Sequence, residues 1–496
     1  MSFVSIKFFI FLGILYISYF LLGRFAPQKQ WVILLLASYV FYSFASLRFV
    51  IFLLFSTVTT WAFPLLMGSH KDKSKLWLLL CVLFNIGMLA VFKYTNFLIT
   101  NSGGQKIDWL IMPLGMSFYV FQSVGYCLDV YWGIIEPETN FLKYALFVSF
   151  FPQISQGPIG KYSELAPQLY TPHSFNYSVW TTGLERTALG FFKKVVVADN
   201  LGLFVDKIYS SYDSSSGILL IAATVFYAFQ IYADFSGYMD ISLGIAQSMG
   251  IEMAENFETP YFSRSIAEYW RRWHITLGAW LKNYIYYPVL RSSAFTKLSK
   301  NLRKSGHKKA AKKLPTAIAL LITWFLLGCW HGVTLNYIVH GLYHGTFVIL
   351  AAVLGEYYAA CCTKLRINTE STAWKTFQIL RTFIIVNIGY VLFRSTGIKM
   401  AFTIYNRIFN NLIFSGWSAV LRTDFTASYW VIIAASLIAC LLIELIEKKE
   451  RFNIWLNRQK YPVKWGILYI LIISVIFTKM FSDAPVASGN FIYFNF

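Results

Sequence analysis

Long apolar runs recur along almost the whole chain, and they constrain its fold more than any other feature. Many of them reach the roughly 20 residues that an α-helix needs to cross a bilayer, whereas an outer-membrane barrel is built from alternating strands of about 10 residues. The chain is 57% hydrophobic and only 13% charged, which is far more apolar than a soluble domain. The sequence therefore predicts an all-α, polytopic membrane protein.

Twelve apolar runs are visible, and they predict about 11 to 13 transmembrane helices, because some are long enough for two spans and others for part of one. The runs cover residues 3–23, 31–60, 76–99, 110–132, 141–155, 184–198, 217–248, 314–355, 374–394, 400–416, 429–447 and 463–481. The first is interpreted as a retained span, since it is long and lacks a small-residue cleavage site before Arg24. We expect one membrane-embedded domain over residues 1–481, followed by a tail at residues 482–496.

The net charge of +20, from 43 basic and 23 acidic residues, is located in short connectors rather than on a nucleic-acid-binding surface. Nine Lys or Arg residues and no acidic residue lie between Arg291 and Lys313, and a second basic connector runs from Lys448 to Lys464. Such connectors stay in the cytosol and can contact anionic lipid headgroups. The bilayer is therefore the expected partner, no nucleic acid is expected, and the tail is predicted to lie outside the cell.

The segment from Glu268 to His274 places charges and an imidazole in an otherwise apolar chain, where polar groups are costly. A capping-box pattern at Ser265 predicts a helix that begins at Ile266. On a continuous helix Arg271 and His274 would share one face, and the arginine would keep the imidazole neutral. The alternative is an interfacial helix whose Arg and Trp side chains anchor at headgroups.

A second candidate, His331, stands in the middle of the apolar run that starts at Leu314. A lone buried histidine is often a structural, hydrogen-bonded residue, so this alternative stays open beside a functional one. Gly328 and Gly332 flank His331 and would let a substrate or another backbone approach closely.

His340 and His344 are spaced i, i+4 and could together hold a metal ion, but no third ligand stands at a recognisable spacing. We therefore predict no metal site and favour interhelical hydrogen bonds for this pair. Asp234 and Asp240 also lie in an apolar run, and both must face protein or water. The Pro- and Gly-rich segment 150–160 is predicted to be re-entrant or to line a cavity.

Two buried histidines with cationic and aromatic neighbours suit the removal of a proton from a hydroxyl group. Alcohols are very weak acids, and a neutral imidazole is a usual general base for them. An activated acyl donor would complete the reaction.

With these motifs the chain resembles the membrane-bound O-acyltransferases (MBOAT), in the bacterial branch that serves alginate O-acetylation. The matching motifs are Phe151-Pro-Gln-Ile-Ser-Gln-Gly-Pro-Ile159, Asp234-Phe-Ser-Gly-Tyr-Met-Asp240, Glu255-Asn-Phe257, Pro260-Tyr-Phe-Ser-Arg-Ser-Ile266, Trp270-Arg-Arg-Trp-His-Ile275, Trp330-His-Gly332 and Gly341-Leu-Tyr-His-Gly345. They cover residues 110–355, the core of the resemblance.

The resemblance implies that His331 is catalytic and that His274 is the second functional histidine. Five further residues are expected to support the site or bind substrate: Trp270, Arg271, Arg272, Trp330 and Asp234. It also implies membrane helices arranged around a central catalytic funnel, with the acyl donor entering from the cytosol and the acceptor from outside.

The function that the resemblance implies is O-acylation, expected to be O-acetylation, of a polysaccharide at the surface of a bacterial cell, by an enzyme of the cytoplasmic membrane. The expected donor is acetyl-CoA or another acyl thioester, on coenzyme A or on an acyl carrier protein, and no bound cofactor is expected. An extracytoplasmic transferase of the serine-hydrolase type and the surface glycan are the expected partners outside.

The tail ends in Phe491-Ile-Tyr-Phe-Asn-Phe496, which is similar to an aromatic motif in a small partner protein of the related teichoic-acid system. Tyr493 is therefore a candidate acyl relay, and the alternative is a docking tail whose aromatic rings anchor at the interface. A different class of function is a transporter or flippase, in which Asp234, Asp240, Arg271 and His331 line a polar path. Transporters often show internal repeats, and none is visible here.

Overall fold

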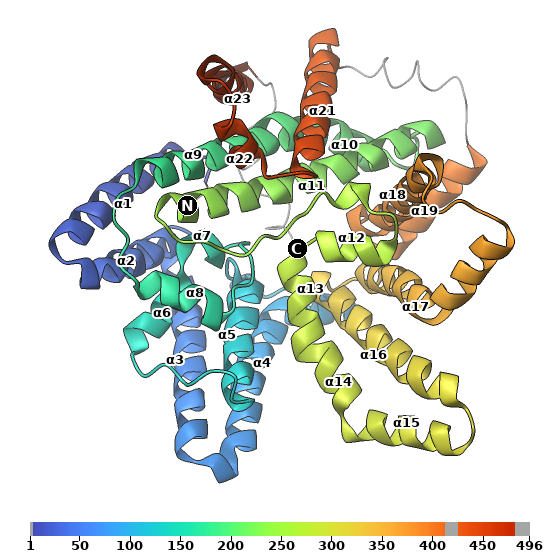
Figure 1. Ribbon diagram of the computed structural model, residues 1–496, viewed down its shortest axis with the longest axis horizontal. Coiled ribbons are helices and arrows are strands. Elements are labelled where there is room, and N and C mark those ends of the chain that lie inside the picture. The colour runs from blue at the N-terminus through green and yellow to red at the C-terminus, as the bar shows by residue number, and fades with distance from the viewer. Residues whose placement is uncertain (1–2, 412–424, 482–496) are drawn as a thin grey trace. The chain divides into compact units, whose positions relative to one another are not determined.

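The computed structural model describes residues 3–411 and 425–481, and their regular structure is helical (Figure 1). Within these ranges the only β-type pairing is an isolated antiparallel bridge between Phe257 and Trp273. The prediction of an all-α protein is therefore confirmed. The predicted tail, and Tyr493 with it, lies outside the described residues.

The chain divides into two compact units. Of the described residues, 3–196, 234–255 and 450–481 form the first unit, and 197–233, 256–411 and 425–449 form the second. The division falls inside one long helix, α11 (Gly217–Ser248), whose first half belongs to the second unit. The organisation of residues 1–481 as one membrane domain stays a prediction.

In the described part of the chain, nine helices are long and apolar enough to cross a membrane. They are α1 (Ile6–Phe25), α3 (Leu47–Ser69), α4 (Ser74–Asn101), α11, α16 (Lys308–His331), α17 (Leu335–Lys364), α18 (Thr372–Arg394), α21 (Ala427–Glu447) and α23 (Tyr461–Phe481). This number is below the predicted range because several apolar runs form helices that are too short to span a bilayer. These are α2 (Gln30–Ser43), α5 (Met116–Tyr131), α6 (Phe141–Ser149), α9 (Tyr177–Phe191) and α19 (Ile398–Asn410).

The remaining helices are short and connect the longer ones. They are α7 (Phe151–Ile154), α8 (Tyr162–Tyr170), α10 (Asp199–Ser210), α12 (Ile266–Arg272), α13 (Ile275–Leu281), α14 (Tyr287–Arg291), α15 (Ser293–Lys304) and α22 (Phe452–Asn457). Three 3₁₀ turns, η1 (Pro27–Lys29), η2 (Lys71–Lys73) and η4 (Pro260–Phe262), and two π-helical turns, η3 (Phe192–Ala198) and η5 (Lys282–Tyr286), complete the described part.

In the first unit, the segment 150–160 is largely irregular and mostly buried, and its predicted role as a re-entrant or cavity-lining segment stays a prediction. It forms only the single turn α7, and neighbouring side chains contact it through two hydrogen bonds. The backbone N–H of Phe151 donates to Ser38 Oγ at 3.1 Å, and the Gln153 side chain bonds to Gln122. Gly115 has φ +69°, and a Cβ there would stand 1.9 Å from the carbonyl oxygen of Ile154, so only glycine lets α5 start beside this segment.

Helices α9 and α11 cross closely in the first unit because glycines face each other at two levels. A Cβ at Gly183 would stand 2.5 Å from the carbonyl oxygen of Gly244, and a Cβ at Gly190 would stand 2.5 Å from that of Gly237. Small residues at such a crossing let two backbones approach, as is common between membrane helices.

The close crossing brings buried charges together. Lys194 Nζ lies 2.6 Å from Asp234 Oδ1, and Lys193 Nζ lies 2.8 Å from Asp240 Oδ2. Arg186 Nε adds a bond of 3.1 Å to Asp240 Oδ1. The prediction that both aspartates face protein or water is therefore confirmed, and their partners come from α9 and η3.

In the second unit, α16 and α17 form an antiparallel hairpin, which Figure 1 shows in yellow and orange. Their backbones nearly touch, since a Cβ at Gly328 would stand 2.8 Å from the Cα of Ile338 and a Cβ at Gly341 would stand 2.5 Å from the carbonyl oxygen of Trp324. Gly328 therefore serves the packing of two helices. The hairpin positions His331, the last residue of α16, beside α17.

Replacing Gly328 with alanine is expected to lower the free energy of unfolding by about 1–3 kcal/mol, because backbone atoms on α17 cannot move aside without a shift of the helix. The matched control is Gly355→Ala on α17, where nothing lies within 4 Å of the added methyl group. Thermal unfolding of the purified variants in one detergent measures the difference. Equal midpoints for Gly328→Ala and wild type would contradict the packing role.

Candidate active site

The predicted helix begins where expected but ends early. Ser265 Oγ accepts a hydrogen bond of 3.1 Å from the backbone N–H of Glu268, and α12 starts at Ile266. The helix stops at Arg272, and a new helix, α13, begins at Ile275. The expectation of one continuous helix is therefore wrong, and Arg271 does not share a helix face with His274.

The break occurs because a distant segment pairs with the chain at this point. The N–H of Glu258 donates to the carbonyl of Arg272 at 3.0 Å, and the N–H of Ile275 donates to the carbonyl of Asn256 at 3.0 Å. These bonds replace helical ones, and they turn His274 into a left-handed conformation with φ 47° and ψ 52°. Such a conformation is uncommon outside glycine and is frequent at functional sites.

His274 is neutral at physiological pH, as the sequence predicts, but for a different reason. Its side chain is 2% exposed, and burial lowers the pKa of the imidazole from 6.5 to about 3. Arg271, which was expected to have this effect, is exposed. A neutral imidazole carries one ring nitrogen with a free electron pair, as a general base requires.

This lowered pKa predicts how stability depends on pH. Between about pH 6.5 and pH 3 the unfolded chain binds a proton at His274 that the folded protein does not bind. The free energy of unfolding should therefore fall as the pH decreases through this window. The variant His274→Gln should show a smaller change in unfolding free energy per pH unit than the wild type. The exposed His70 gives the control His70→Gln. Equal slopes for His274→Gln and wild type, from denaturant titrations in detergent at several pH values, would contradict the burial effect.

His331 lies where the long apolar run is interrupted. The chain leaves α16 at this residue and starts α17 at Leu335, so His331 stands at a helix end and not in the middle of a span. Its side chain is 5% exposed. The ring centroid of His331 lies 4.8 Å from that of Trp330 and 5.1 Å from that of Phe393 on α18.

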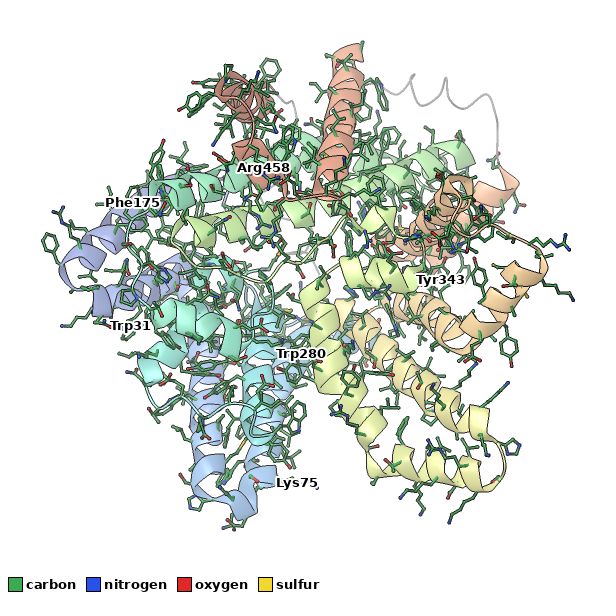
Figure 2. The ribbon with its side chains drawn as sticks, viewed as in Figure 1. Trp31, Lys75, Phe175, Trp280, Tyr343 and Arg458 are labelled. Atoms are coloured by element: carbon green, nitrogen blue, oxygen red, sulfur yellow. The ribbon has the colours of Figure 1, made fainter. Side chains whose placement is uncertain are left out.

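Trp330 joins the two predicted histidines. Its ring centroid lies 6.1 Å from that of His274 in addition to the 4.8 Å contact with His331. The ring centroid of His340 on α17 lies 6.3 Å from that of His331. The ring centroid of His344, on the same helix, lies 4.7 Å from that of His340. We call these five residues the histidine cluster. Figure 2 labels Trp280, which lies on α13, the helix that begins directly after His274. It also labels Tyr343, which lies on α17, the helix that carries His340.

His340 makes the interhelical hydrogen bond that the sequence favours. Its Nδ1 lies 2.9 Å from the carbonyl oxygen of Gly389 on α18, and because that oxygen can only accept, Nδ1 carries the proton. No group of three metal-ligating side chains occurs among residues 3–411 and 425–481.

The remaining predicted residues have different surroundings. The ring of Trp270 lies 5.2 Å from that of His344, so it reaches the histidine cluster. Arg272 forms an ion pair of 2.8 Å with Glu268 on its own helix. Asp234 belongs to the first unit, where it pairs with Lys194.

Sequence reasoning missed two groups of residues. The first is Asn256, which hydrogen-bonds to the chain next to His274 and lies in the motif Glu255-Asn-Phe257, for which the sequence predicted no role. The second group is formed by the cations Arg186, Lys193 and Lys194, which lie in the apolar run 184–198. Three cations in an apolar run indicate that they pair with buried acids, and the structure pairs them with Asp234 and Asp240.

Comparison with known proteins shows the family of the chain. Residues 135–393 match the family described as MBOAT, membrane-bound O-acyltransferase. The chain is 32% identical to the probable alginate O-acetylase AlgI of Pseudomonas syringae over 422 residues, which are 82% of this chain and 73% of that protein. It is 32% identical to the peptidoglycan O-acetyltransferase of Helicobacter pylori over 79% of this chain and 76% of that protein.

A third relative is more distant. The teichoic acid D-alanyltransferase of Bacillus subtilis is 26% identical over 78% of this chain and 96% of its own length. Taken together with the nine apolar helices among the described residues, these matches define the class of protein. The chain belongs to the membrane-bound O-acyltransferase family. It is a multi-pass membrane enzyme that transfers acyl groups to oxygen, as the sequence motifs predict.

Proposed function

We propose that this enzyme moves an acetyl group from a cytosolic thioester to hydroxyl groups of a polysaccharide at the cell surface. The relatives named above as an alginate O-acetylase and a peptidoglycan O-acetyltransferase support acetyl as the acyl group and a surface polymer as the acceptor. The donor is acetyl-CoA, or an acetyl group on an acyl carrier protein, and it approaches from the cytosol.

The observation that carries this proposal is the joint contact of Trp330 with His274 and His331. Two buried imidazoles that contact the same indole form a candidate site in which both histidines have little exposed surface. A neutral imidazole in such surroundings can accept a proton from a hydroxyl group, and exclusion of water protects the thioester from hydrolysis.

In the proposed reaction His331 is the general base. As the acceptor oxygen attacks the thioester carbonyl, His331 takes the hydroxyl proton and a tetrahedral intermediate forms. The carbon–sulfur bond then breaks, the new ester is released, and the imidazolium returns its proton to the departing sulfur. His274 shares or positions this proton transfer, and no metal or bound cofactor takes part in the proposed steps.

The other candidate residues have supporting roles in this proposal. Trp270 and Trp330 form aromatic walls of the site, and Arg272 connects α12 to the preceding segment by its bond of 3.2 Å to Thr259 Oγ1. Arg271 is exposed and is available to bind an anionic part of the donor. Asp234 contributes through the packing of α11.

Tyr493 is proposed as an acyl relay to a separate transferase of the serine-hydrolase type outside the cell. The support for this step is the sequence motif at the end of the chain. Mass spectrometry of the C-terminal peptide should find an acetyl group on Tyr493 that disappears in Tyr493→Phe. Absence of the modified peptide in a fully active protein would refute the relay and leave direct transfer.

Measurement of ester-linked acetate on the surface polymers of the native cell tests the proposal. Deletion of the gene should remove the acetate that mild alkali releases, and expression of the wild-type chain should restore it. Unchanged acetate in the deletion strain would show that the acceptor lies elsewhere.

A further inference from the structure

The side chain of Asn256 lies at the break between α12 and α13. Asn256 is 1% exposed, and its Oδ1 is 3.0 Å from the backbone nitrogen of Thr276 and 3.0 Å from Thr276 Oγ1. The same oxygen is 3.2 Å from Nδ1 of His274. One buried amide oxygen is therefore shared by the ring of His274 and by two groups of Thr276.

The backbone N–H of Thr276 fixes which way the amide of Asn256 points. A backbone N–H can only donate, so the atom that faces it must be the amide oxygen and not the NH₂ group. An amide oxygen can only accept, so Nδ1 of His274 must donate to it. The proton of the neutral ring is therefore on Nδ1, and the electron pair is on Nε2.

We propose that Asn256 is a positioning residue that holds His274 in the Nδ1–H tautomer, so that Nε2 is the atom that accepts a proton or a hydrogen bond from the acyl acceptor. This inference rests on the proposed function, in which His274 takes part in proton transfer. The arrangement has the logic of other enzymes in which a partner at one ring nitrogen decides what the other nitrogen can do. Burial of His274, which keeps the ring neutral, agrees with a role as acceptor.

The left-handed backbone conformation of His274 is a second observation that supports a positioning role for Asn256. A residue with a Cβ adopts such a conformation only when its surroundings enforce it. Backbone bonds from Asn256 and Glu258 on one side, and the Asn256 side chain on the other, supply that constraint. The same segment therefore sets both the direction of the imidazole and its tautomer.

The test compares Asn256→Leu with two matched changes in purified enzyme reconstituted into vesicles. Asn256→Leu removes the acceptor oxygen and should lower kcat for acetyl transfer by about 10- to 100-fold per folded molecule. Asn256→Asp keeps an acceptor oxygen and should retain more activity than Asn256→Leu. Thr276→Val removes the Thr276 hydroxyl but leaves the bond to His274, so it should lose much less activity than Asn256→Leu.

A double variant separates positioning from a general structural effect. If Asn256 acts through His274, then Asn256→Leu should cause no further loss in a His274→Ala background. A clear further loss there, a wild-type rate for Asn256→Leu alone, or equal losses for Asn256→Leu and Thr276→Val would overturn the inference. The ¹⁵N spectrum of His274 in histidine-labelled protein gives a readout independent of activity, and it should show the proton on Nδ1 in wild type.

The same set of variants distinguishes this inference from the proposed function. Normal transfer by His331→Ala would refute the proposed mechanism, whatever Asn256 does. Loss of transfer in His331→Ala and His274→Ala, together with normal transfer in Asn256→Leu, would leave the mechanism intact and refute the role of Asn256 alone.

Discussion

Replacement of His331 by alanine is expected to lower the rate of acyl transfer by about 10²- to 10⁴-fold, which is the usual contribution of a general base. The change removes the group that the proposed reaction uses as its general base for the acceptor proton. His331 packs against Trp330 and Phe393 with little exposed surface, so water cannot easily replace its imidazole. The measurement is the initial rate of ester formation from a labelled acetyl thioester by equal amounts of folded protein.

The control for this variant is His70→Ala, which makes the same chemical change at an exposed histidine before η2. It should transfer acetyl groups at the wild-type rate. Size-exclusion profiles and thermal midpoints should show that His331→Ala remains folded. A folded His331→Ala protein with normal turnover would exclude His331 as the base.

Removal of one partner from the buried pair of Asp234 and Lys194 is expected to cost about 3–5 kcal/mol of unfolding free energy. The two side chains are 1% and 4% exposed, and their charged atoms lie 2.6 Å apart. Asp234→Leu leaves an ammonium group, and Lys194→Met leaves a carboxylate, in a region where neither can reach bulk water. Each single variant should therefore unfold at a much lower temperature or fail to accumulate.

The double variant Lys194→Met with Asp234→Leu should recover most of the lost stability, because it removes both charges together. Thermal unfolding of the four proteins in one detergent gives the coupling energy of the pair. Additive losses in the double variant would show that the two charges do not stabilise each other. A catalytic role for Asp234 would instead appear as low turnover in a stable double variant.

Several local features around the candidate site could be predicted from the sequence, because their signals come from neighbouring residues. Long apolar runs indicated membrane helices, the pattern at Ser265 gave the correct start of α12, and the spacing of polar residues singled out His274 and His331. The motif Trp330-His331 also carried the tryptophan that contacts both histidines. In each case a few neighbouring residues were sufficient to predict what the structure has.

The rest depends on contacts between distant parts of the chain. The break at His274 is caused by residues 256–258, and no pattern within the helix itself predicts a partner 18 positions away. The partners of Asp234 and Asp240 come from η3 and α9, and the sequence does not state which cation meets which acid. Among the described residues, fewer helices are long enough to span a membrane than the apolar runs predict, because several of these runs form short helices.

The most direct test of the central claim follows an acetyl group across a membrane. Vesicles containing the purified protein in one orientation receive a labelled acetyl thioester on the cytosolic face only, with a hydroxyl acceptor such as an oligosaccharide on the other face. The proposed function predicts labelled ester on the acceptor side and an equal amount of free thiol on the donor side, both lost in His331→Ala. Appearance of the intact thioester on the acceptor side without release of thiol would contradict it.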